Sequence, residues 1–113
     1  MHAIRWKRFF VAAALLCGAP ALVQQSWAQQ SIKAEGRALA MTICSACHSI
    51  DKDDGASKNL AAPAFSAVAA MPSATRLSLR VFLRSHHTVM PAIILTDDQI
   101  DAISEYILDL RTK

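Results

Sequence analysis

The stretch ICSACHSI, residues 43–50, places Cys44 and Cys47 three positions apart, with His48 directly behind the second cysteine. Three kinds of site use a Cys-x-x-Cys pair: a structural zinc centre, a redox-active disulfide and the attachment site of a c-type haem. Each needs different partners elsewhere in the chain, so the rest of the sequence discriminates among them.

The first two kinds of site lack their usual context. A structural zinc ion takes four ligands, commonly in two pairs, and the only histidines further along the chain are the adjacent His86 and His87. A thioredoxin-like pair lies between a strand and a helix, and no part of this sequence alternates with the period of a strand over a useful length. The sequence therefore disfavours both.

The third kind of site gives every residue of the motif a role. Two thiols separated by two residues can reach the two vinyl groups on one edge of a porphyrin, and the following histidine is carried under the ring to the iron. The motif predicts one haem c, attached covalently through Cys44 and Cys47, with His48 as a ligand of the iron.

The beginning of the chain has the features of an export signal. Basic residues at 5–8 precede an apolar run at 9–16, and a small-x-small cleavage site follows at 26–28. We expect residues 1–28 to be cleaved, which leaves residues 29–113 as one exported, periplasmic domain. A membrane-retained leader is the alternative, although the run is shorter than the about 20 apolar residues that a spanning helix needs, and we expect no membrane span after cleavage.

The positive charge of the chain belongs to this leader. It holds three of the 12 Lys and Arg residues and none of the nine Asp and Glu residues, so the remainder carries nine charges of each sign. We expect no nucleic-acid partner, because phosphate binding needs a surplus of positive charge on one surface.

Apolar residues recur with helical spacing, which predicts an all-α domain of three to five helices. Gly36 in the first of them costs it about 1 kcal/mol relative to alanine, so we expect close backbone packing there, at a crossing near Tyr106. Residues 49–64 are expected to form a loop. The expected helices run from Ser31 to about Cys44, from Phe65 to Met71, from Ser73 or Thr75 through Leu79, Phe82 and Leu83, and from the capping box Thr96/Gln99 through Ile100, Ile103, Ile107 and Leu110.

With these elements in place, the sequence resembles the class I cytochromes c. The resemblance covers nearly all of residues 29–113: a first helix with Gly36 that enters the CSACH motif, a proline in AAPAF, a Met-Pro pair in HTVMPAIIL and the closing segment LTDDQIDAISEYILDL. The sequence departs from the family pattern in two ways. It has Leu39 where many relatives pack an aromatic residue, and it has no tryptophan near the haem.

The resemblance implies a role for each matching position. Cys44 and Cys47 form the thioethers, His48 is the proximal iron ligand and Met90 the distal one. Pro63 resembles the proline whose carbonyl accepts a hydrogen bond from the proximal histidine. A covalently attached haem would also provide the additional stabilisation that a short chain needs to complete its core.

Several residues compete for the distal position or for contacts with the haem. Met71 also precedes a proline, and ligation by His86 or His87 would give a bis-histidine iron of lower potential. Arg80 and Arg84 are candidates for contacts with the haem propionates or with a partner protein.

The expected function is single-electron transfer by a His/Met-ligated haem, with no bond chemistry by the protein itself. The partners would be redox proteins such as a dehydrogenase, an oxidase or another cytochrome, met either by a free monomer or by the cytochrome subunit of a periplasmic dehydrogenase complex. The alternative is a haem enzyme or gas sensor with an open distal position, in which His86 or His87 acts as an acid–base group.

Overall fold

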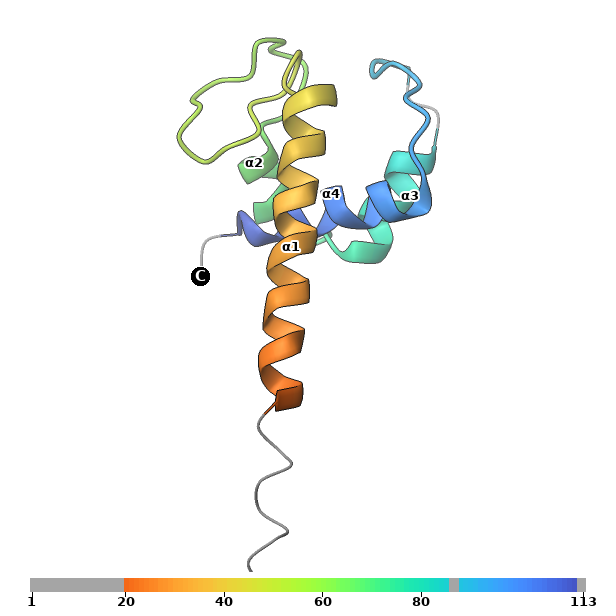
Figure 1. The fold of residues 1–113 in the computed structure, drawn as a ribbon. Helices are drawn as coiled ribbons and strands as arrows, with labels where there is room; N and C mark the ends of the chain where they lie inside the picture. Colours follow the sequence, from red (N-terminus) through yellow and green to blue (C-terminus); the bar gives the residue numbers. More distant parts are fainter. Residues whose placement is uncertain (1–19, 86–87, 112–113) are drawn as a thin grey trace, which may run out of the picture.

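The computed structural model describes residues 20–85 and 88–111, and this part of the chain is helical with no strand. It contains four helices: α1 Pro20–Ile43, α2 Phe65–Ala70, α3 Arg76–Arg84 and α4 Asp97–Asp109. Helix α4 contacts each of the other three, and α1 crosses it (Figure 1). None of the described helices is long and apolar enough to cross a membrane. The prediction of an all-α domain with three to five helices is confirmed.

The predicted start of the first helix at Ser31 is wrong, because α1 begins at Pro20. Proline suits a first helical position, and the alanine, leucine and glutamine residues that follow are good or adequate helix formers. Ser31 therefore lies inside the helix, where its hydroxyl donates to the Ala28 carbonyl at 2.8 Å. The first part of α1 projects away from the other helices (Figure 1). The predicted leader overlaps it, and cleavage after Ala28 stays a prediction.

The close packing predicted at Gly36 is present where α1 crosses α4. Gly36 is buried, and a Cβ at this position would lie 2.0 Å from the Ala102 carbonyl oxygen and 2.9 Å from the Cβ of Tyr106. No residue with a side chain fits at this distance, so the glycine allows the two helix backbones to approach.

The starts of α3 and α4 are both fixed by capping boxes. Thr96 accepts a hydrogen bond from the Gln99 amide while the Gln99 side chain accepts one from Thr96, as predicted. Thr75 and Ser78 make the same reciprocal pair at the start of α3. Helix α2 ends at Ala70, one residue before its predicted end, with Met71 as the C-cap in front of Pro72.

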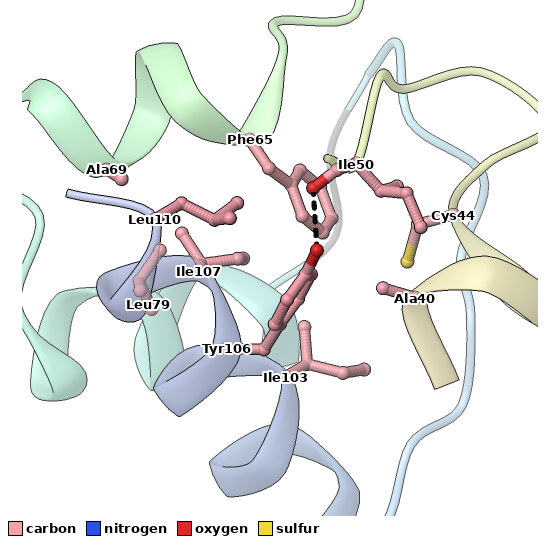
Figure 2. Packing of buried hydrophobic residues seen from close by; sticks show 10 residues of the cluster. All are labelled: Ala40, Cys44, Ile50, Phe65, Ala69, Leu79, Ile103, Tyr106, Ile107 and Leu110. Carbon is pink, nitrogen blue, oxygen red and sulfur yellow. Dashed lines mark hydrogen bonds between the residues drawn. The ribbon is translucent and has the colours of Figure 1, made fainter. Parts of the chain in front are cut away.

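The core lies between α4 and the elements around it (Figure 2). The predicted α4 stripe is buried along its length, since Ile100, Ile103, Ile107 and Leu110 are each at most 9% exposed. Of the apolar residues predicted on α3, only Leu79 is buried, whereas Phe82 is 52% exposed. The reason is that α3 turns this part of its apolar face toward a cavity. The main core cluster consists of Ala40, Cys44, Ile50, Phe65, Ala69, Leu79, Ile103, Tyr106, Ile107 and Leu110.

Candidate haem site

A cavity of about 730 Å³ opens between the end of α1, the loop that follows it, α3 and the segment before α4. This is within the usual size range of cofactor and ligand sites. No charged residue among those that the structure describes lines it, and its polar side chains apart from the motif come from Asn59, Ser73, Ser78 and Thr88. The residues predicted to hold a haem lie together on its walls: Cys44, Cys47, His48, Pro63 and Met90. Such an apolar pocket suits a flat, apolar macrocycle.

The motif itself forms a tight turn at the end of α1. The amides of Cys47 and His48 both donate to the Cys44 carbonyl, at 3.1 and 2.9 Å. This turn brings Cys44, Cys47 and His48 together at the cavity, which all three residues line. The two cysteines are free thiols, Cys44 buried and Cys47 half-buried.

The surroundings of Cys44 do not resemble those of a redox-active dithiol. A reactive cysteine needs a lowered pKa, and burial raises the pKa of the Cys44 thiol. In the described part of the chain, no group of three or more His, Cys, Asp or Glu residues is placed to hold a metal ion. His86 and His87, which were weighed as zinc or iron ligands, lie outside the described residues.

The imidazole of His48 is held by the residue that sequence resemblance assigns to this role. Its Nδ1 lies 2.7 Å from the Pro63 carbonyl oxygen, which can only accept, so Nδ1 carries the proton and donates. The other ring nitrogen, Nε2, then keeps its lone pair for a metal. A hydrogen bond of this kind fixes the tautomer and the ring orientation of a metal-binding histidine and raises its basicity.

Phe65 stabilises this arrangement from the other side of the loop. Its ring centroid lies 5.4 Å from that of His48, and its amide donates to the Ser49 carbonyl at 2.9 Å. Phe65 is the first residue of α2 and is only 6% exposed, so the wall beneath the imidazole is part of the core.

Two of the three described methionines line the cavity, Met71 and Met90, while Met41 is not among the lining residues. Met71 is fixed at the end of α2: its amide donates to Val68 and its carbonyl accepts from Ala74. Met90 is half-buried in the segment 88–95, for which no backbone–backbone hydrogen bond occurs among the described residues. The backbone of Met71 is therefore held at the end of α2, whereas Met90 lies in a segment without regular structure between α3 and α4.

The arginines proposed for propionate contacts are engaged elsewhere, and that prediction is not supported. Arg80 lies 3.2 Å from Asp101, Arg84 contacts Asp97, and neither arginine lines the cavity. Together with the Arg76–Glu105 contact they form a series with a spacing of four residues on both α3 and α4. We call these three contacts the arginine ladder.

Asn59 is a cavity residue that the sequence analysis missed. Its backbone amide donates to the Cys47 carbonyl at 3.0 Å, and its side-chain oxygen accepts from the Ala61 backbone amide at 3.0 Å. It therefore ties the loop to the motif. An asparagine four residues before a proline in a loop is typical of a local side-chain turn, but that signal does not predict its contact with Cys47.

Comparison with known families identifies the family of this chain. The model of the family described as Cytochrome c matches residues 33–111, a range that includes the motif, the cavity and all of α2, α3 and α4. Neither the curated proteins nor the solved structures give a match. Members of this family carry haem c bound covalently through their cysteines and are in general electron carriers. With Cys44, Cys47 and His48 at one wall of an apolar cavity and a family match over most of its length, this chain belongs to the cytochrome c family.

Proposed function

We propose that this protein is an exported monohaem cytochrome c in which His48 and Met90 are the axial ligands of the iron and Cys44 and Cys47 form the thioethers. It passes single electrons between redox proteins, either as a free carrier or as the cytochrome subunit of a periplasmic dehydrogenase.

The His48–Pro63 hydrogen bond is the observation that carries this proposal. A 2.7 Å contact to a carbonyl oxygen leaves Nε2 as the only ring nitrogen able to bind a metal, and the imidazole lines the cavity. Met90 lines the same cavity from a segment far along the chain. The pairing of a histidine and a thioether is the usual ligand set of electron-transfer cytochromes c.

When bound, the haem supplies the one-electron chemistry, and the chain controls its surroundings. His48 and Met90, which both line the cavity, would hold the iron and would leave no position on it for a substrate. Apolar residues from α2 and α3, among them Phe65, Leu79 and Leu83, exclude water from the cavity. A low-polarity site of this kind reduces the solvent rearrangement that accompanies a change of charge.

We infer export and the class of partner from the sequence. The features of residues 1–28 predict secretion, and covalent haem attachment suits an exported protein. With equal numbers of acidic and basic residues after the leader, recognition of the partner would depend little on long-range charge. A dehydrogenase, an oxidase or another cytochrome is the class of partner that this chemistry requires.

The test is a redox titration and a carbon monoxide assay of the purified holoprotein, expressed in a host that attaches haem to CxxCH motifs. We expect reversible one-electron reduction, one haem that survives acid extraction, and a ferrous protein that does not bind carbon monoxide at neutral pH. Rapid stoichiometric carbon monoxide binding would show an open distal position. In that case the peroxidase-like or gas-sensing alternative replaces electron transfer.

A further inference from the structure

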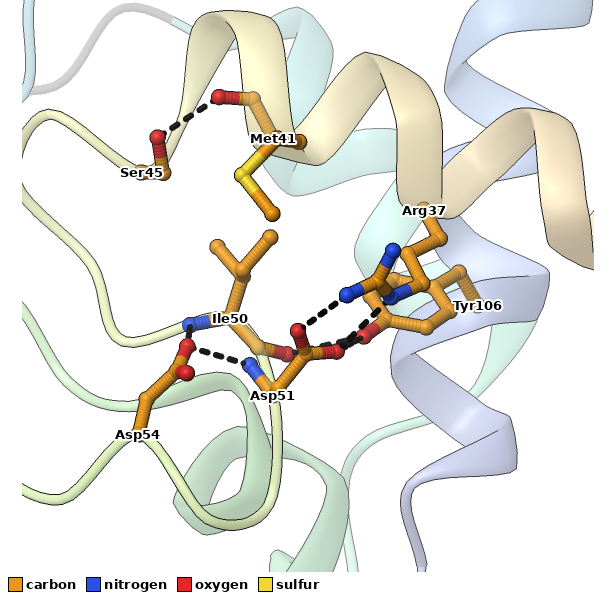
Figure 3. Close-up of polar contacts among 7 residues, drawn as sticks. All are labelled: Arg37, Met41, Ser45, Ile50, Asp51, Asp54 and Tyr106. Atoms are coloured by element: carbon orange, nitrogen blue, oxygen red, sulfur yellow. Dashed lines mark hydrogen bonds and ion pairs between the residues drawn. The ribbon is translucent and has the colours of Figure 1, made fainter.

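A polar cluster joins the residues that follow His48 to the crossing of α1 and α4 (Figure 3). Arg37 of α1 donates to both carboxylate oxygens of Asp51, from Nε to Oδ1 at 3.0 Å and from Nη2 to Oδ2 at 2.6 Å. Tyr106 of α4 donates its hydroxyl to the Ile50 carbonyl at 3.1 Å and also contacts Asp51 Oδ1. We call Arg37, Asp51 and Tyr106 the triad.

Tyr106 is the buried member of the triad, and its hydroxyl needs an acceptor. Tyr106 is 6% exposed and Ile50 1%. A buried hydroxyl without an acceptor is costly, and both acceptors of this one belong to residues just after the proposed iron ligand. Burial, and then Asp51, raise the pKa of Tyr106, so the hydroxyl stays a donor. The hydrogen bond from Arg37 lowers the pKa of Asp51, so its carboxylate stays charged.

Two other side chains hold this segment from within the loop. Asp54 Oδ2 accepts the amides of Ile50 and Asp51 at 3.0 and 2.8 Å, and Ser57 Oγ accepts the amide of Ser49 at 2.9 Å. These bonds set the shape of the loop but not its place on the helices. Among the described residues, the polar contacts that fasten residues 50 and 51 to α1 and α4 are those of the triad.

We propose that the triad is a positioning device for the proximal ligand. It anchors residues 50 and 51 to the α1–α4 crossing and thereby keeps the His48 ring aligned with the Pro63 carbonyl. The inference rests on the proposed function, because it takes His48 as a ligand of the iron.

The consequence reaches the iron through one hydrogen bond. If the loop shifts on the helices, the Nδ1–H of His48 is held less well by Pro63 and the imidazole becomes a weaker base. A weaker base stabilises the ferric iron less, so the reduction potential rises. The same loosening exposes the Nδ1 proton to exchange with water.

The experiment compares two triad variants with the conservative replacement Asp51→Glu and with a matched control, all as holoproteins. Asp51→Asn removes the charge, and Tyr106→Phe removes the hydroxyl while keeping the ring and the Cβ that lies beside Gly36. The control is Lys33→Ala, because the Lys33–Asp109 pair also links α1 to α4 but does not touch the loop. The readouts are the reduction potential and the solvent-exchange rate of the His48 Nδ1 proton, measured by NMR on the reduced protein.

Both triad variants are expected to show Nδ1–H exchange about fivefold faster or more and a raised potential, with Asp51→Glu recovering part of the loss and Lys33→Ala unchanged. If the triad variants unfold more easily but keep the wild-type exchange rate and potential, the positioning role is wrong. It is equally wrong if Lys33→Ala moves both readouts as far. A wild-type His48 ring without the ring-current shifts of an iron ligand would overturn the proposed function as well.

Discussion

Replacing Gly36 by alanine should destabilise the holoprotein, although alanine is the better helix former. The added Cβ would lie 2.0 Å from the Ala102 carbonyl oxygen and 2.6 Å from its carbonyl carbon. The first of these distances is 1.4 Å inside the 3.4 Å at which ordinary contact begins. Both atoms belong to the α4 backbone, so no side-chain rotation relieves the clash and the helices must move apart.

The two opposing effects have known sizes. Alanine gains about 1 kcal/mol over glycine inside a helix, whereas an oversized group in a packed interior costs about 1–3 kcal/mol and occasionally more. Because the clash is with backbone, we take the upper end of that range, which leaves a net loss of about 2 kcal/mol. For a domain of this size the melting temperature should fall by roughly 10 °C.

Thermal unfolding of the purified holoproteins, followed by circular dichroism, measures this effect. Ala38→Gly is the matched control, because Ala38 is exposed in the same helix. This replacement measures the difference in helix propensity between alanine and glycine away from the helix crossing. That variant should lose about 1 kcal/mol. A Gly36→Ala protein that unfolds at or above the wild-type temperature would refute the close helix crossing.

Three further predictions concern pH, capping and charge. The Arg37 hydrogen bond lowers the pKa of Asp51, so its stabilising contribution is present above the ordinary aspartate pKa and is lost as the pH falls through the folded-state value. The stability difference between wild type and Asp51→Asn should therefore shrink below about pH 4 in acid-unfolding experiments, and a constant difference would contradict it. Thr96→Ala should lower the unfolding free energy by about 1 kcal/mol in a denaturant titration, whereas Thr42→Ala, exposed within α1, should not; equal losses would argue against the cap. Because each arginine of the ladder contacts an α4 carboxylate, reduction by small anionic and cationic complexes should respond only weakly to ionic strength, and steep, opposite salt dependences would contradict this.

Local signals in the sequence were sufficient for most of the fold. The capping box at Thr96 and the apolar stripe after it predicted α4. Gly36 predicted the crossing, because a glycine inside a helix destabilises the helix unless close packing requires it. The start of α1 was wrong because a serine that resembles an N-cap also fits inside a helix when the preceding residues are helix formers, as they are before Ser31.

Contacts between distant residues were harder to predict. Nothing in the sequence pairs Tyr106 with Ile50 and Asp51, which are 56 and 55 residues away, because such a contact depends on how the helices cross. The sequence holds a signal for the arginine ladder that did not enter the prediction. Basic residues four apart on α3 contact acidic residues four apart on α4. That spacing would have indicated an antiparallel helix pair, and would have removed Arg80 and Arg84 from the propionate candidates.

The motif predicted the proximal side of the haem site more fully than the distal side. Cys44, Cys47 and His48 are neighbours in sequence, and their turn brings them together whatever the rest of the chain does. The proposed distal ligand, Met90, comes from a remote segment, and both Met71 and Met90 line the cavity. The choice between them depends on the position of a side chain relative to the iron, which sequence spacing does not define.

The central claim is that Met90 completes the coordination of the iron. It is tested most directly by the ferric absorption spectra of Met90→Ala and Met71→Ala, two truncations of the same residue type in the same cavity. We predict that Met90→Ala loses the weak sulfur-to-iron charge-transfer band and becomes high-spin, while Met71→Ala keeps the wild-type spectrum. A Met90→Ala protein that keeps the band, or a Met71→Ala protein that loses it, would contradict the assignment of Met90 as the distal ligand.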